Sequence, residues 1–122
     1  MLGKDTIVNA IIEALTFFEG QTITTAGAQA VTAKKSSVLL NNATATIAAT
    51  IADAANHAGL FTVKAGLEPA VGQDHTLTLT AGTFDGTNNV ATFADKDDSL
   101  TVVFDHTGNG TIINNTGSVV LS

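Results

Sequence analysis

Few side chains in this sequence are suited to chemistry, and they gather in short polar stretches. The three histidines, His57, His75 and His106, each lie in or beside a cluster of turn-forming residues. None has a second histidine two or four positions away, the spacing that places two ligands on one metal ion. We therefore expect three solvent-exposed turn histidines. The alternative is that a threefold assembly brings three copies of one histidine together on its axis.

The stretch "DHTGNG", residues 105–110, partly matches a calcium-binding loop. Its residues fill positions 1, 3, 5 and 6 of that pattern with Asp105, Thr107, Asn109 and Gly110. Position 12, where the loop needs a bidentate glutamate, is Thr116. A tight hairpin turn with Asn-Gly at its tip explains the same residues better.

A second acidic stretch, "DKDDSL" at residues 95–100, places Asp95, Asp97 and Asp98 within four positions. Clustered carboxylates bind Ca²⁺, but Leu100 stands where a tight calcium loop has glycine. We predict a solvated acidic turn that discourages edge-to-edge strand pairing. A structural Ca²⁺ held here or at Asp105 is the alternative.

Other catalytic patterns are missing from the sequence. Cysteine is absent, which excludes thiol nucleophiles, thiolate metal ligands and disulfides. There is no Gly-x-Ser-x-Gly elbow, and "GTFDG" at residues 82–86 precedes a strand instead of opening a phosphate-binding helix. Trp and Tyr, the aromatic platforms of many sugar-binding sites, are also absent. We therefore expect no enzyme activity and no cofactor.

Net charge and hydropathy limit the kinds of partner that this chain could bind. The 122 residues carry a net charge of −6, with five basic residues and no basic stretch that would neutralise phosphates. No apolar run approaches the roughly 18 residues that would span a bilayer. We expect neither a nucleic-acid partner nor a membrane partner.

Most of the chain has the pattern of a β domain. Threonine is abundant, and apolar alternation recurs between turn signals, which is typical of a β-sandwich or barrel-like fold. The expected strands cover residues 38–40, 44–51, 60–64, 76–80, 90–93, 100–104, 111–114 and 119–121. The alanine-rich residues 48–58 are also compatible with a short helix. No repeat of fixed length is present, so nothing predicts a solenoid.

The ribbon at residues 75–104 shows the alternation most clearly. Leu77 and Leu79 point to one face, and Thr76, Thr78 and Thr80 point to the other. The expected core residues of the ribbon are Leu77, Leu79, Phe93, Leu100 and Val102. The threonine face is a candidate surface for contact between copies of the chain.

The first 36 residues are expected to form a separate attachment region. The sequence "TIVNAIIEALTFF" at residues 6–18 predicts an amphipathic helix, and residues 20–36 predict an extended arm or short strands ordered by neighbouring chains. The all-β domain would then cover residues 37–122. The residues expected to bind the partner lie on the apolar stripe of the helix: Ile7, Ile11, Ile12, Leu15 and Phe18.

The β region resembles a known group of proteins. The segments "AGLFTVKAG", "HTLTLTAGTFDGTNNVATFADKDDSLTVVFDHTGNGTII" and "SVVLS" resemble the small β domains of tailed-bacteriophage virion proteins, namely head-decoration (cement) proteins and head-fibre bases. The resemblance covers roughly residues 37–122. One departure is "TII" at residues 111–113, where such domains often have a tryptophan.

The resemblance implies a structural role. It implies a homotrimer, made in the host cytoplasm, that binds the major capsid protein at threefold positions on the capsid exterior and stabilises the head. The helix and arm would then make the capsid attachment. The alternatives are a tail-fibre or baseplate component, or a stand-alone cell-surface binding module.

Overall fold

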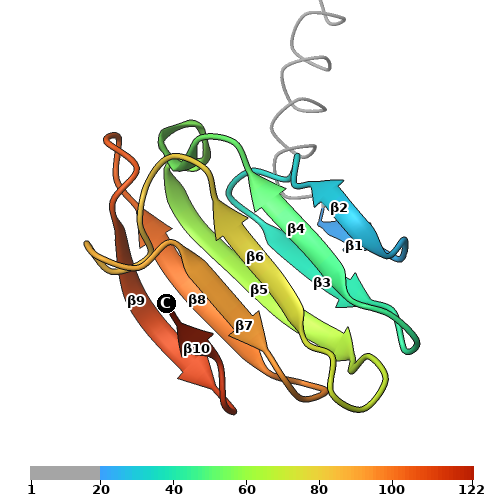
Figure 1. The fold of residues 1–122 in the computed structure, drawn as a ribbon. Coiled ribbons are helices and arrows are strands. Elements are labelled where there is room, and N and C mark those ends of the chain that lie inside the picture. Colours follow the sequence, from blue (N-terminus) through green and yellow to red (C-terminus); the bar gives the residue numbers. More distant parts are fainter. Residues whose placement is uncertain (1–19) are drawn as a thin grey trace, which may run out of the picture.

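In a computed structural model, residues 20–122 are described, and they form two five-stranded sheets packed face to face (Figure 1). Sheet A has the strand order β1-β3-β5-β8-β9, and sheet B has the order β10-β7-β6-β4-β2. The strands are β1 (Gln21–Ile23), β2 (Gly27–Ala30), β3 (Ser37–Asn41), β4 (Ile47–Ile51), β5 (Gly59–Leu67), β6 (His75–Leu79), β7 (Val90–Phe93), β8 (Ser99–Phe104), β9 (Gly110–Thr116) and β10 (Val120–Leu121).

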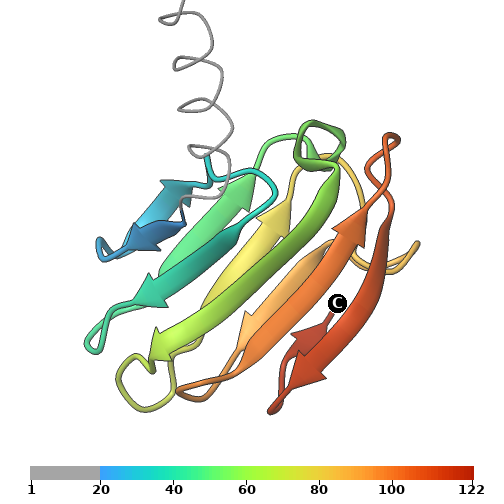
Figure 2. The same ribbon diagram turned by 180° about the vertical axis from the view of Figure 1, so that it is seen from behind.

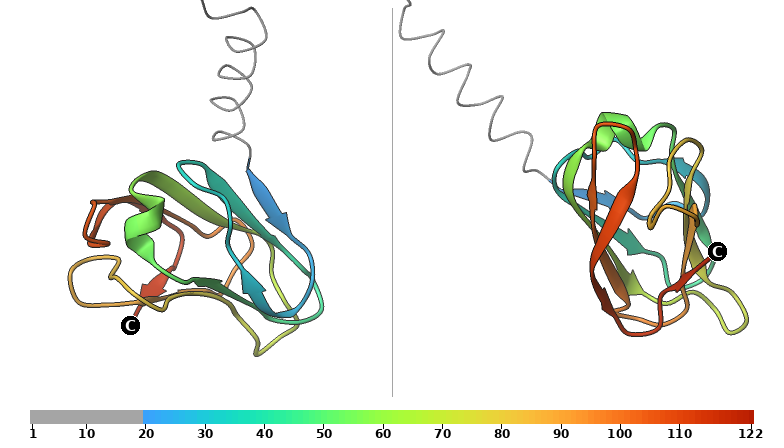
Figure 3. Two further views of the ribbon diagram at one scale, coloured as in Figure 1. Left: turned by 90° about the horizontal axis from the view of Figure 1, so that it is seen from above. Right: turned by 90° about the vertical axis from the view of Figure 1, so that its left-hand side faces the viewer.

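The mainly β fold predicted from the sequence is confirmed. Figures 1 and 2 show the two sheets from opposite sides, and Figure 3 shows the layers edge-on. A short 3₁₀ helix, η1 (Ala54–His57), follows β4, so residues 48–58 are strand at one end and helical at the other. The helix expected over residues 6–18, with its stripe of Ile7, Ile11, Ile12, Leu15 and Phe18, lies outside the described residues.

Strict alternation of apolar residues builds the core between the sheets. In β8 every second side chain is buried, because successive side chains of a strand point to opposite faces. The five core residues expected in the ribbon are all buried, with exposed fractions of 0 or 1%: Leu77, Leu79, Phe93, Leu100 and Val102. The ribbon supplies β6 and β7 to sheet B and β8 to sheet A, so its inward side chains are buried between the two sheets of the same chain.

The first six strands are arranged as three stacked coils. The chain alternates between the sheets, and β1, β3 and β5 pair in parallel in sheet A, as β2, β4 and β6 do in sheet B. One strand of each sheet makes one coil of a flattened solenoid. The aligned residues Gln21, Val38 and Val63 are 17 and 25 residues apart. Because the coils differ in length, the sequence contains no repeat that would reveal them.

The last four strands pair in antiparallel fashion. Strand β7 pairs with β6, β8 with β5, β9 with β8, and β10 with β7. The edges of the sandwich are thus β1 and β2 at one side and β9 and β10 at the other, as Figure 1 shows.

Of the two forms expected for residues 20–36, an extended arm or short strands, the structure has the short strands, but it is their own chain that orders them. Their strands β1 and β2 pair with β3 and β4, so they belong to the two sheets of the same chain. The side chains of Ile23 and Val31 are only 5% and 6% exposed. The Gln21 side chain joins the two sheets at this edge, since its Oε1 accepts from the amides of Thr32 and Ala33 and its Nε2 donates to the carbonyl of Ala30. The boundary expected at residue 36 therefore falls inside the sandwich.

Candidate interaction surface

His75 is a structural residue of the core, contrary to the exposed turn position expected for it. Its side chain is fully buried. Nδ1 accepts a hydrogen bond from the Ile47 amide at 3.0 Å, which places the ring proton on Nε2. Nε2 lies 2.9 Å from the Leu67 carbonyl oxygen and 3.0 Å from that of Asn42, both of which accept from it. The ring thus joins the start of β4 to the end of β5 and to the β3–β4 connection, and no ring nitrogen is left for a metal or a substrate.

His57 is also buried, at 6% exposure, which corrects the expectation for this residue as well. Its Nδ1 is 2.8 Å from the Ala33 carbonyl oxygen, and its ring meets Phe61 edge-on with 6.0 Å between the centroids. Burial lowers the pKa of His57 below its ordinary value, the Ala33 hydrogen bond acts in the opposite direction, and the nearby charge of Lys34 lowers the pKa further. His106 alone is exposed in a turn, as predicted.

The acidic turn at residues 95–98 is held by a buried carboxylate. Asp98 is 3% exposed, and its oxygens accept hydrogen bonds from the Asp95 amide and from the amide and hydroxyl of Ser118, each at 3.1 Å. The expected solvated turn is therefore correct for the exposed Asp95 and Asp97 but wrong for Asp98. Its carboxylate ties the connection between β7 and β8 to the connection between β9 and β10.

Asp105 organises the hairpin turn between β8 and β9. Its Oδ1 accepts from the hydroxyl and amide of Thr107 and from the amide of Asn109. These hydrogen bonds, above all the one from the Thr107 hydroxyl, hold the pKa of Asp105 below its ordinary value. The hairpin was predicted, but its left-handed residue is Gly108, with φ of 88°, so the tip precedes the Asn-Gly pair.

Asp85 fills a comparable role in the loop between β6 and β7. Its carboxylate accepts from the amides of Asn88 and Thr87 and from the Asn88 side chain. The hydrogen bonds from Asn88 are the main reason that the pKa of Asp85 lies below its ordinary value. Like Asp105, this residue uses its oxygens to fix a turn.

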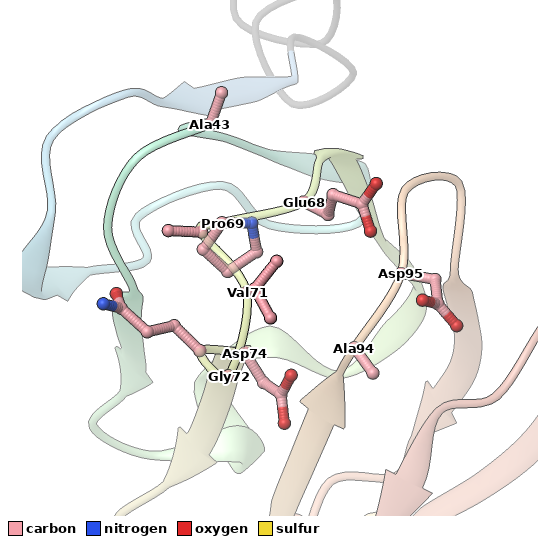
Figure 4. Close-up of a pocket in the computed structure, with 10 residues that line it drawn as sticks. Ala43, Glu68, Pro69, Val71, Gly72, Asp74, Ala94 and Asp95 are labelled. Carbon is pink, nitrogen blue, oxygen red and sulfur yellow. The ribbon is translucent and has the colours of Figure 1, made fainter.

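One surface hollow of about 510 Å³ lies beside the loop between β5 and β6 (Figure 4). Pro69 and Val71 line it together with three carboxylates, those of Glu68, Asp74 and Asp95. Figure 4 shows these carboxylates spread around the rim and pointing in different directions. Such an arrangement does not converge on one ion or one substrate atom, as a binding site requires.

Residues 20–122 also lack a metal-binding cluster and a membrane-spanning helix. In that range no group of three or more histidine and acidic side chains is placed to hold a metal ion. The same residues include no helix with the length and apolarity to cross a membrane.

The outer face of sheet B is the most distinctive surface of the domain. None of its five strands contains a charged residue. Small and β-branched side chains cover it in two rows that the strand register aligns: Ala28, Ala48, Thr76, Thr92 and Val120 in one row, and Ala30, Thr50, Thr78 and Val90 in the other. The threonine face noted in the sequence is thus part of a continuous neutral surface.

Sheet A has a different outer face. Lys64 lies on it and forms an exposed ion pair with Asp97 at 3.3 Å. Leu60 is 56% exposed on β5, and the hydroxyls of Thr62 and Thr101 are hydrogen-bonded at 3.1 Å. The two faces therefore differ in charge, which offers a matched control for experiments on either one.

No protein-family model, curated protein or solved structure matches this chain. Its function is therefore inferred from its own residues and from the resemblance seen in the sequence.

Proposed function

We propose that this chain is a structural virion protein, a homotrimeric capsid decoration protein that binds the outer capsid surface at threefold positions and stabilises the head. The neutral outer face of sheet B is the observation that carries this proposal, because it offers a surface for self-association. The resemblance of residues 37–122 to phage decoration domains supplies the virion context.

Two protein surfaces that associate must remove the charged groups between them from water. Burying a charge at an interface is expensive unless a partner compensates it, and the cores of interfaces are depleted in charged residues. This chain has a net charge of −6, so identical copies repel one another in general. Two copies can bring such an uncharged face together without desolvating a charged group. Its β-branched side chains have restricted rotamers, so they present a rigid surface.

Self-association is tested by placing a charge at the centre of that face. We expect the wild-type chain to be a trimer at micromolar concentration by light scattering, and Thr78→Lys to reduce the mass to that of a monomer. Thr62→Lys, which places the same charge at a similar position on sheet A, is the matched control and should leave the trimer intact. A monomeric wild-type chain, or equal effects of the two substitutions, would contradict the proposed trimer surface.

Capsid attachment is tested on the apolar stripe expected at residues 6–18. Capsids built from the major capsid protein of the same virus should gain thermal stability when the wild-type chain is added. Ile11→Asp with Leu15→Asp should abolish this gain and leave the trimer intact, because the charges fall on the stripe. Asn9 and Thr16 are polar positions that helical spacing places on the face opposite the stripe. Asn9→Asp with Thr16→Asp therefore adds the same charge away from the stripe and should keep the gain. Binding to arrayed glycans without any capsid binding would favour a cell-surface module instead.

A further inference from the structure

The edge strands of the sandwich lack the charges and the proline that often prevent strand pairing, although β1 and β10 are very short and β9 has an irregularity at Ile113. Natural sheets guard their edges with lysine, proline or inward-pointing charges. None of the four edge strands β1, β2, β9 and β10 contains a charged residue or proline. Apolar side chains are exposed at one of these edges, where Ile113 of β9 is 59% exposed and Val120 of β10 is 60% exposed.

In each sheet the two edge strands run in the same direction, so one edge can pair in parallel with the opposite edge of another copy. In sheet B, β2, β4 and β6 are parallel, β7 is reversed, and β10 is reversed again. Strand β10 therefore runs in the same direction as β2 at the opposite edge. The same reasoning shows that β9 runs parallel to β1 in sheet A. A copy placed beside the first one in the same orientation thus offers parallel strands to both edges.

We propose that copies of this chain associate edge to edge, with β10 of one copy pairing in parallel with β2 of the next. This inference rests on the proposed homotrimer and names its contact. The occupant of each edge is a second copy, because the pairing repeats the one that joins β2 to β4 within the chain. A contact between two different edges is heterologous, and three copies close it into a ring.

Sheet B is the sheet that faces the threefold axis in this ring. Three sandwiches around an axis meet at an angle, so only one sheet of each copy brings its edges within hydrogen-bonding reach of the next. The neutral outer face of sheet B suits the crowded position at the axis, whereas Lys64 and its ion pair suit the outside.

The register across sheet B identifies the residues that meet. Val120 aligns with Thr92, Thr92 with Thr76, Thr76 with Ala48, and Ala48 with Ala28. Extending this row across the contact places Val120 beside Ala28 of the next copy. Both residues are exposed in the single chain, so both accept substitution without disturbing the core.

A mixing experiment tests the heterologous contact. Val120→Lys blocks one edge and Ala28→Lys blocks the other, and each variant alone should be monomeric by light scattering, with association weakened about tenfold or more. Mixed in equal amounts, the two variants should form a 1:1 dimer, because each retains one intact edge of opposite kind. Leu60→Lys, at similar exposure on the central strand β5, should remain a trimer.

Cysteine cross-linking provides a second measurement that leaves the edges uncharged. The chain contains no cysteine, so Val120→Cys and Ala28→Cys introduce the only thiols. A mixture of the two variants should form the mixed disulfide between copies under mild oxidation, and neither variant alone should cross-link efficiently.

The outcomes separate this inference from the proposed function. If the wild-type chain is a trimer but the edge variants stay trimeric and the mixed disulfide does not form, the edge contact is wrong and the homotrimer stands. If the wild-type chain is a monomer, both fail. If a blocked variant forms homodimers, the contact joins identical edges and the heterologous pairing is overturned.

Discussion

Replacing His75 with alanine is expected to lower the free energy of unfolding by about 3 to 5 kcal/mol. The imidazole is fully buried and satisfies the amide of Ile47 and the carbonyls of Asn42 and Leu67. Alanine leaves the buried Ile47 amide and the two partly buried carbonyls without this partner, and it opens a cavity between β4, the end of β5 and the β3–β4 connection. Both effects add, because the first removes hydrogen bonds and the second removes packing contacts.

Urea denaturation followed by circular dichroism measures this effect directly. His106→Ala is the matched control, since it deletes the same side chain from an exposed turn and should change the free energy of unfolding by less than about 0.5 kcal/mol. His75→Gln restores part of the hydrogen bonding and should fall between alanine and wild type. A loss of under 1 kcal/mol in His75→Ala would show that water readily replaces the ring.

The inward position of His75 follows from the strand pattern, although the neighbouring turn residues favour an exposed one. The alternation that places Leu77 and Leu79 in the core assigns the same inward face to residue 75. In the same way, Asp98 shares the parity of Leu100 and Val102. His75 is the first residue of β6, and Asp98 directly precedes β8. Both residues are next to turn residues, which suggested that they would be exposed. The strand alternation predicts their burial correctly, because neighbouring groups form the hydrogen bonds that these polar side chains need.

The strands themselves were predictable, but their pairing was not. Alternation located β6, β7 and β8 closely, because it is a local property of the sequence. The parallel coils arise because consecutive strands alternate between the two sheets. The loops between these strands differ in length, so no regular spacing in the sequence indicates the pairing. The weakly apolar residues 20–36 were expected to need neighbouring chains, yet parallel pairing to β3 and β4 and the Gln21 side chain hold them in place.

The candidate interaction surface was only partly visible in the sequence. Thr76, Thr78 and Thr80 suggested a threonine face, but one ribbon cannot show whether its neighbours are charged. The strand register supplies that information by aligning Ala48 and Thr92 with Thr76. The pairing of distant strands therefore defines the outer face of sheet B. It also shows that the edge strands β2 and β10 run in the same direction.

Replacing Asp98 with alanine is the other change expected to have a large effect, lowering the free energy of unfolding by about 2 to 4 kcal/mol. The buried carboxylate accepts from the Asp95 amide and from both the amide and the hydroxyl of Ser118. These contacts join the two adjacent connections that carry the chain between the sheets. Without them the β9–β10 connection keeps the hydrogen bond from the Ser118 hydroxyl to Asp95 and the packing of the buried Val119, but its attachment to the body of the sandwich is weakened.

The matched control for Asp98→Ala is Asp97→Asn. Asp97 is exposed and has a φ of 71° that asparagine tolerates, and its side chain forms a surface ion pair with Lys64. Asp97→Asn should therefore change the free energy of unfolding by less than about 1 kcal/mol. If the carboxylate of Asp98 acted by holding Ca²⁺, a chelator would destabilise the wild-type chain to the level of Asp98→Ala. We expect the chelator to have no effect, because protein donors already occupy both oxygens of Asp98.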